Sequence, residues 1–328
     1  MSSLAAPATL PGSSSPAPAS TSASADRSRS VFPWLLLAPF LLLVLVFTIV
    51  PLFGATVLST QQTFGPGTSR FVGLSNFRGV LSDPLFWTAF KNTFVFTLGS
   101  VCVQLPLALC FAMLLNQPGI RGKSFFRLIL FSPVLVGVVY VAMIFFVLFQ
   151  KRTGLINQLL AGILPSWDVG FAWLDQYIML ALILATLWQY MGFNMVYFLA
   201  ALQNVPKELD EAAKMDGANW WKRFRHVTLP AITPVGSFVV LLSIIGSFQV
   251  FELPFLLLQG STGVDNKGLT IVGYLYQTGF QSGDLGYASA IGWTIAIVLA
   301  VCAGLQRLLS AGSEVSRGGK VARGGGAK

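Results

Sequence analysis

One charged, helix-prone stretch interrupts this chain, and it reads Glu208-Leu209-Asp210-Glu211-Ala212-Ala213-Lys214-Met215-Asp216-Gly217-Ala218. It continues through Trp220 and Trp221 to Val227-Thr228-Leu229-Pro230. Long apolar segments precede it and follow it. The fold therefore has to be worked out from these apolar segments first, and the charged stretch placed between them.

The composition indicates a polytopic membrane protein. Hydrophobic residues make up 54% of the 328 residues and charged residues 10%, whereas about a quarter of a soluble domain is charged. The net charge of +9 comes from basic residues dispersed at the ends of apolar runs, so nucleic acid is not an expected partner. The three cysteines lie in apolar segments without a CxxC spacing, and the chain has one histidine; neither a disulfide nor a metal site is expected.

Six stretches are long enough to cross a lipid bilayer, whose core of about 30 Å needs about 20 apolar helical residues. They are residues 33–58, 92–116, 125–149, 178–201, 231–255 and 285–309. We therefore predict an all-α, six-helix transmembrane domain over 31–310. A disordered tail over 1–30 and a disordered basic tail over 311–328 are expected on either side of it.

The distribution of Lys and Arg predicts the orientation in the membrane. With both termini in the cytoplasm, 15 of the 21 basic residues fall on the cytoplasmic side and 6 on the outer side. Cytoplasmic loops carry an excess of Lys and Arg, so both termini are predicted to be cytoplasmic. The charged stretch, between the fourth and fifth spans, is then cytoplasmic as well.

Within the charged stretch, the residue order predicts two short helices joined at a glycine. Pro206 suits the first turn of a helix, and Glu208 faces the positive end of its dipole. Gly217 supplies the turn because glycine enters left-handed conformations without penalty. A second amphipathic turn begins at Trp220, and the next spanning helix is expected to start near Leu229-Pro230. A helix that only anchors a loop at the membrane interface is the alternative.

The spacing within the stretch is more particular than amphipathicity requires. Glu211-Ala212-Ala213 is followed after three residues by Gly217, and after nine more by Val227-x-Leu229-Pro230. This pattern resembles the EAA loop of binding-protein-dependent ABC transporter permeases, here over about 204–230. Residues 202–209 and 284–290 are similar to the carbohydrate-uptake branch, the maltose and glycerol-phosphate type. The resemblance covers about 33–309 and implies the type I ABC importer permease fold.

The resemblance also implies partners for this chain. A second homologous permease subunit, a dimer of ABC ATPases and an extracytoplasmic solute-binding protein would complete an importer in the bacterial plasma (inner) membrane. The ATPase would use ATP and Mg²⁺, and this chain would bind no cofactor and would not be an enzyme. The residues implied in coupling to the ATPase are Glu211, Ala212, Ala213, Asp216, Gly217, Leu229 and Pro230.

The sequence lacks the usual signals of a nucleotide-binding site and of other transport mechanisms. Gly122-Lys123-Ser124 is similar to the end of a phosphate-binding loop, but Gln117 stands where the first glycine is required. The spans carry neither an Arg repeat nor a series of Asp, Glu and His residues for proton transfer, and Glu252 is expected at the outer end of the fifth span. An ion-coupled secondary transporter of a small polar solute remains the alternative, beside a membrane-anchored structural or receptor subunit.

A sugar site needs neutral hydrogen-bonding side chains together with aromatic rings. The fourth and fifth spans supply Trp188, Gln189, Tyr190, Gly192, Asn194, Tyr197, Ser243, Ser247, Gln249 and Phe251. Of these, the residues predicted to line a substrate path are Gly192, Asn194, Ser243, Ser247 and Gln249. Helix packing is the alternative role for small and polar residues of this kind. The substrate could be a disaccharide, a larger oligosaccharide, a sugar alcohol or glycerol phosphate, and the scarcity of basic residues in the spans favours a neutral solute.

Overall fold

The computed structural model describes residues 32–63 and 69–324, with side chains over 34–63 and 69–308. The predicted tail over 1–30 lies outside the described residues. The chain divides into two compact units, Met1–Pro51 and Leu52–Lys328. The first contains α1 (Phe32–Val44), a π-helical turn (Leu45–Ile49) and the start of α2 (Val50–Ser59).

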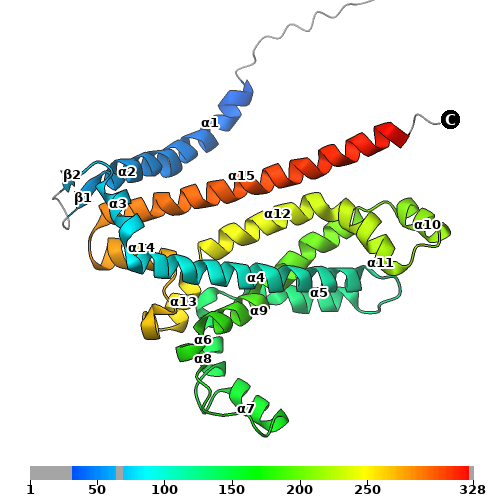
Figure 1. Ribbon diagram of the computed structural model, residues 1–328, viewed down its shortest axis with the longest axis horizontal. Helices are drawn as coiled ribbons and strands as arrows, with labels where there is room; N and C mark the ends of the chain where they lie inside the picture. Colours follow the sequence, from blue (N-terminus) through cyan, green and yellow to red (C-terminus); the bar gives the residue numbers. More distant parts are fainter. Residues whose placement is uncertain (1–31, 64–68, 325–328) are drawn as a thin grey trace, which may run out of the picture. The chain divides into compact units, whose positions relative to one another are not determined.

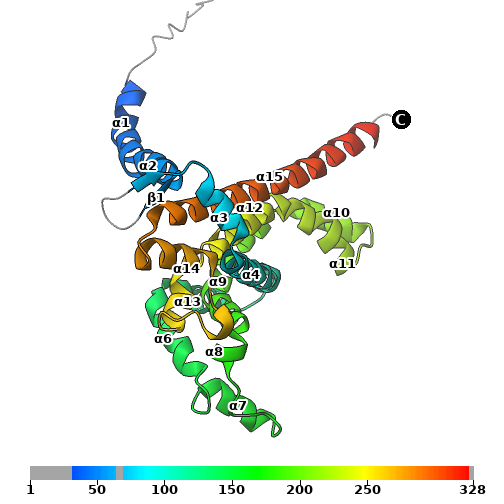
Figure 2. The same ribbon diagram turned by 60° about the vertical axis from the view of Figure 1, so that its left-hand side comes forward.

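The second unit holds the remaining elements, which are almost all helical (Figures 1 and 2). A short antiparallel hairpin of β1 (Gln61–Thr63) and β2 (Ser69–Phe71) is the one departure from an all-α fold among the described residues. The helices are α3 (Ser75–Ser82), α4 (Pro84–Asn116), α5 (Lys123–Phe131), α6 (Val138–Leu148), α7 (Leu155–Ile163), α8 (Trp173–Gln176), α9 (Ile178–Gln203), α10 (Lys207–Met215), α11 (Trp220–Arg223), α12 (Leu229–Phe248), α13 (Glu252–Leu257), α14 (Ile271–Tyr276) and α15 (Leu285–Gly324).

Helices α4, α9 and α12 pack together in the core of this unit (Figure 1). Ala108 and Ala112 of α4 are fully buried against Met195 and Phe198 of α9, and Val239 of α12 belongs to the same cluster. Small side chains let helix backbones approach closely, which is how helices associate in a membrane without a hydrophobic driving force. These three helices position the cavity described below.

The described residues contain five helices that are long and apolar enough to span a membrane, or six if one bent pair counts as a span. The bent pair is Lys123–Leu135 and Val138–Leu148, which meet at 97°. The third predicted span, 125–149, is therefore not one straight helix. Pro133 lies in the 3₁₀ turn Ser132–Leu135, and Gly137 precedes α6 with an extended ψ of 141°; proline cannot donate the hydrogen bond that would continue the helix.

The fifth span also differs from its prediction of 231–255. A continuous helix runs over Trp220–Phe248, comprising α11, a π-helical turn (Phe224–Thr228) and α12. Leu229-Pro230 thus starts α12, as predicted, but α12 continues without a break from α11 and the π-helical turn. The wide turn just before Pro230 accommodates a ring that would otherwise clash with the preceding turn.

The last helix extends past the predicted end of the domain at residue 310. It continues to Gly324, across most of the segment 311–328 that the sequence predicts to be disordered. No proline interrupts residues 311–324, so every residue there can donate its backbone N–H to the helix.

A cluster of polar side chains joins α4, α14 and α15 at one end of the second unit. The Asp83 carboxylate, which caps α4, accepts hydrogen bonds from the hydroxyl groups of Tyr274 and Tyr287. Burial raises the pKa of Asp83, but the bonds from Tyr274, the Leu85 N–H and Tyr287 outweigh it, so the pKa is lowered overall. Burial, reinforced by Asp83, raises the pKa of Tyr274 to about 12. Asn92 adds hydrogen bonds to the carbonyls of Asn266 and Leu269.

Candidate functional site: a polar cavity and an exposed loop

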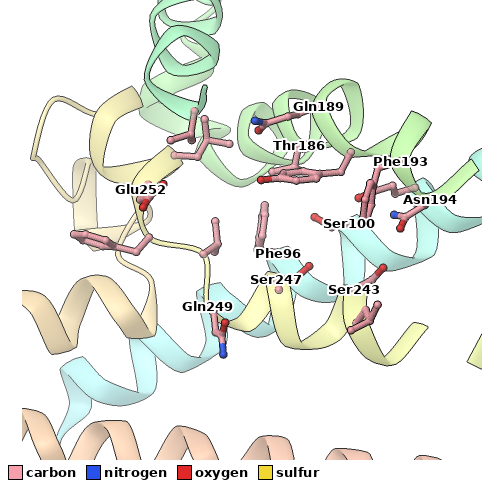
Figure 3. A pocket seen from close by; sticks show the side chains of 18 of the residues that line it. Phe96, Ser100, Thr186, Gln189, Phe193, Asn194, Ser243, Ser247, Gln249 and Glu252 are labelled. Atoms are coloured by element: carbon pink, nitrogen blue, oxygen red, sulfur yellow. The ribbon is translucent and has the colours of Figure 1, made fainter. Parts of the chain in front are cut away.

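A cavity with a volume of about 540 Å³ lies among α4, α9, α12 and the segment 249–253 (Figure 3). Thr186, Gln189, Phe193 and Asn194 project from α9, and Ser243 and Ser247 from α12 lie across the hollow from them. Most lining groups are neutral hydrogen-bonding side chains or aromatic rings. This is the lining that a small polar ligand with some apolar surface requires.

The α9 side of the cavity is one helical face. Its members recur at three- and four-residue intervals, which places them in a row along a helix. Gln189 and Asn194 are only 3% and 6% exposed. The Gln189 side-chain nitrogen donates to the Val136 carbonyl at 3.3 Å, whereas its Oε1 has no hydrogen-bond partner among the described residues.

Helix α4 contributes a second row, formed by Phe96, Ser100 and Gln104 at four-residue intervals. Ser100 is 3% exposed, and its Oγ has no hydrogen-bond partner among the described residues. An unpaired buried polar atom costs about 1–3 kcal/mol. Both oxygens are enclosed by protein, so a polar ligand or water reaches the oxygens of Ser100 and Gln189 only when these side chains change rotamer.

The remaining side is formed where α12 ends. Ser243, Gly246 and Ser247 line the cavity from one face of α12, because residues three and four apart lie on the same side of a helix. The chain then leaves the helix at Gln249 and starts α13 at Glu252. The sequence predicts Glu252 at the end of a longer helix, but the break at Gln249 instead places it on the cavity lining.

Four of the five predicted path residues line this cavity: Asn194, Ser243, Ser247 and Gln249. The fifth, Gly192, does not. A Cβ atom at Gly192 would lie 1.7 Å from the Leu130 carbonyl oxygen and 2.9 Å from the Phe131 nitrogen. Gly192 is thus a contact between α9 and α5, the packing role that was the alternative to lining a path.

Sequence reasoning missed the whole α4 side of the cavity and Thr186 on α9. A signal was present, because Ser100 and Gln104 are polar residues one helical turn apart in a mostly apolar span. Polar groups inside membrane spans usually face the protein interior. Their partner helix, however, could only be found from the structure.

The charged stretch forms α10, a turn and α11, at the opposite end of the second unit from α14 (Figure 1). Gly217 has a φ of +73°, as the sequence predicts for the turn. The Ala218 N–H donates to the Ala213 carbonyl at 2.9 Å, and the Gly217 N–H to the Lys214 carbonyl at 3.0 Å. These two bonds define a Schellman motif, which ends helices at a left-handed residue.

An ion pair closes the turn between α10 and α11. The Asp210 carboxylate accepts hydrogen bonds from Arg223 Nε at 2.7 Å and Nη2 at 3.0 Å, and lies 2.9 Å from Lys214 Nζ. A bidentate arginine pair fixes direction as well as distance. The hydrogen bonds from Arg223, followed by those from Lys214, lower the pKa of Asp210.

The outer surface of this loop is open and partly apolar. Glu211, Ala212, Asp216 and Gly217 are exposed, and Ala213 is half-buried. The large apolar side chains exposed beside them are Leu209, Met215, Trp220 and Trp221. A concentration of exposed apolar groups rimmed by charges is typical of a surface that binds another protein or a membrane.

Comparison with known proteins identifies the family to which this chain belongs. Residues 104–311 match the family described as "Binding-protein-dependent transport system inner membrane component". The chain belongs to this family. The matched region contains the exposed loop and most of the cavity, whereas Phe96 and Ser100 lie just before it.

Two relatives in this family cover nearly the whole chain. The arabinooligosaccharides transport system permease protein AraP of Halalkalibacterium halodurans is 41% identical over 288 residues, which are 87% of this chain and 89% of that protein. The lactose transport system permease protein LacF of Rhizobium radiobacter is 33% identical over 281 residues, 85% of this chain and 94% of that protein. Both names describe transport permeases.

A solved structure shares the fold. It is a chain of a bacterial ABC transporter involved in the import of the acidic polysaccharide alginate, with a TM-score of 0.75 and 24% sequence identity over 86% of this chain and 96% of that chain. The importer-type permease fold predicted from the sequence is thereby confirmed. The ion-coupled alternative has no support among the family members, and the cytoplasmic position of the two termini stays a prediction.

Proposed function

We propose that this family member is a permease subunit of an ATP-driven carbohydrate importer in the bacterial plasma membrane. The names of the AraP and LacF relatives support a saccharide as the transported solute. A second permease subunit, a dimer of ABC ATPases and an extracytoplasmic solute-binding protein would complete the importer. A related alginate transporter has been solved with a periplasmic protein that holds an alginate pentasaccharide, which supports a binding protein as a partner.

The observation that carries the proposal is the composition of the cavity. Hydroxyl and amide groups from Ser100, Gln189, Asn194 and Ser247 face a hollow that also presents the Phe193 ring. Sugars offer hydroxyl groups and weakly apolar faces, so they need this combination of neutral polar and aromatic partners. In the proposed importer the cavity is half of the translocation path.

The α10–α11 loop is the proposed site of coupling to the ATPase. Glu211 would make a polar contact with the partner, and Ala212 and Ala213 would allow close approach. The turn at Gly217 fixes α10 against the start of the helix Trp220–Phe248. Closure of the ATPases on ATP would then move one continuous helix, an element with two positions biased by nucleotide. ATP and Mg²⁺ would be bound by the ATPase subunits and not by this chain.

Uptake of a labelled neutral oligosaccharide into proteoliposomes tests the proposal. The liposomes contain the chain with its partner permease and ATPase, and the binding protein is added outside. Uptake should require ATP on the ATPase side and should not respond to an ion gradient. Uptake that persists without ATP and follows an imposed ion gradient would overturn the proposed mechanism.

Substitutions at the two sites should have different effects. Asn194→Leu and Ser247→Leu should weaken saccharide uptake without changing the amount of assembled importer. The matched control is Thr233→Leu on α12, because Thr233 lies off the cavity and bonds only to the Leu229 carbonyl of its own helix. Unchanged affinity and rate in the first two variants would instead favour a packing role.

The coupling loop is tested by Glu211→Lys and Gly217→Val. Both should abolish ATP-driven uptake while the complex remains in the membrane. Asp175→Lys makes a similar charge change at an exposed position of α8, outside the loop, and should leave uptake unchanged. Normal uptake with Glu211→Lys would sink the assignment of this loop.

A further inference from the structure

The charge balance of the cavity carries an inference about which saccharides can pass. Among its described lining residues, Glu252 is the single carboxylate, and none is Lys, Arg or His. Every other polar lining group is a neutral hydroxyl or amide. A solute in this cavity therefore meets one negative charge and no positive charge from this chain.

The backbone holds Glu252 in a fixed place. Helix α12 ends at Phe248, and Glu252 is the first residue of α13. The next residue, Leu253, is 4% exposed and packs in a core cluster with Val141 and Phe145 of α6. The Glu252 side chain itself is exposed, so it can reach a solute in the cavity while its backbone stays anchored.

No neighbouring group cancels this charge. The ion pairs among the described residues involve Asp210 and Asp265, and Glu252 takes part in none of them. Lys267, from the loop before α14, pairs with Asp265. Neither a hydrogen bond nor an ion pair to Glu252 occurs among the residues that the structure describes.

The free hydrogen-bonding atoms elsewhere in the cavity suit hydroxyl groups. The Oγ of Ser100 and the Oε1 of Gln189 are buried and unpartnered within the described structure. Once a rotamer change turns these enclosed atoms into the cavity, a sugar hydroxyl can donate to the Gln189 oxygen and can both donate to and accept from the serine. A hydroxyl that donates to the Glu252 carboxylate forms a charge-assisted bond, which is about twice as strong as a neutral one.

An anionic saccharide would be repelled by the Glu252 carboxylate. At an effective dielectric constant of about 20, two like charges about 8 Å apart repel by an amount equivalent to more than a tenfold loss of affinity. No cation of this chain lines the cavity to offset that repulsion. Discrimination by an unpaired like charge is a standard means of rejecting the wrong partner.

We propose that Glu252 is a specificity residue that binds hydroxyl groups of a neutral or amino-bearing saccharide and rejects saccharides that carry a carboxylate or phosphate. The inference rests on the proposed function, because it requires the cavity to lie on the transport path. It narrows the substrate to uncharged or basic saccharides, and glycerol phosphate is then excluded from the candidates.

Three saccharides that differ only at one end test the proposal. Arabinotriose can be prepared as its neutral alditol, its anionic aldonate and its cationic 1-amino derivative. The affinity of each is measured by its competition with tritiated alditol for the complex of both permeases and the ATPase in nanodiscs. The binding protein is left out, so its own selectivity does not affect the result. Wild type should bind the aldonate at least about tenfold more weakly than the alditol.

Glu252→Gln, which keeps the shape and removes the charge, should bring the aldonate and alditol affinities within about threefold of each other. Asp265→Asn removes another exposed carboxylate, from outside the cavity, and should keep the wild-type selectivity. Equal binding of all three saccharides by wild type would overturn the proposal, as would unchanged discrimination in Glu252→Gln.

Failure of the proposed function gives a different result, since wild type would then bind none of the three saccharides. If the Glu252→Gln complex no longer binds the alditol, the proposal is decided by Glu252→Asp, because aspartate retains the negative charge. Rejection of the aldonate by Glu252→Asp supports the proposal, and its acceptance overturns it.

Discussion

Gly192 lies where α9 and α5 come closest, and its replacement by alanine tests how the cavity is held in shape. The added Cβ would lie 1.7 Å from the Leu130 carbonyl oxygen, although real Cβ atoms essentially never approach another heavy atom within 3.0 Å. The two helices must therefore separate by about 1.3 Å or more at this point. The neighbour is backbone, which has no rotamer that could relieve the clash.

The loss of stability in Gly192→Ala follows from the contact of residue 192 with the backbone of Leu130. Overpacking a well-packed interior destabilises by about 1–3 kcal/mol and occasionally more, and a clash with backbone belongs at the upper end. Gly246→Ala is the matched control, because no atom lies within 4 Å of a Cβ built there. Alanine in place of an unhindered helical glycine stabilises by about 0.4–1 kcal/mol.

Thermal unfolding of the purified complex, followed by tryptophan fluorescence, measures both variants. We expect Gly192→Ala to unfold about 5 °C or more below wild type and Gly246→Ala to unfold at or above the wild-type temperature. A Gly192→Ala protein with wild-type stability and reduced saccharide affinity would refute the packing argument. It would return Gly192 to the substrate path.

Substitutions at three positions probe the loops. Asn157→Leu should destabilise residues 150–177 by about 2–3 kcal/mol, because buried Asn157 accepts from the indole N–H of Trp173 at 2.8 Å; amide exchange there should quicken, and unchanged protection would contradict this. Because the pKa of Asp210 is lowered in the folded chain, the pair with Arg223 stabilises α10 and α11 fully above about pH 4. This stabilisation is lost as the pH falls through the lowered pKa of Asp210. Asp210→Asn should remove this pH dependence, as measured by amide exchange in α10 and α11. The loss of stability should be below about 1 kcal/mol, because the pair is partly exposed. A variant that still shows the pH dependence would mean that another group titrates. For Gly217, with its φ of +73°, ATP-driven uptake should fall in the order glycine, asparagine, alanine, because asparagine tolerates the left-handed region better; equal uptake by all three would mean that the turn is not needed.

Local chemistry made part of the molecule predictable. The length of an apolar run is a property of the sequence alone, so five spans were located from it without knowledge of their neighbours. The turn at Gly217 was predictable for the same reason, since only the backbone freedom of one residue was involved. The neutral polar side chains of the fourth and fifth spans likewise indicated four of the residues that line the cavity.

Tertiary contacts decided the rest. Hydropathy does not record direction, so the 97° bend between α5 and α6 was not visible in an apolar run that continues through Pro133. Gly192 is small because Leu130 approaches it from a distant part of the chain, and a sequence gives the small residue without its neighbour. The α4 side of the cavity was missed because pairing Ser100 with α9 requires the packing of two helices.

The unbroken helix Trp220–Phe248 has a mechanical consequence. Its 29 residues extend about 43 Å at 1.5 Å per residue, well beyond a hydrocarbon core of about 30 Å. A rod of this length that pivots near its middle moves both ends in opposite directions. Trp220 and Ser247 would therefore move in opposite directions, so in the proposed importer a push on the loop would reshape the cavity through this one helix.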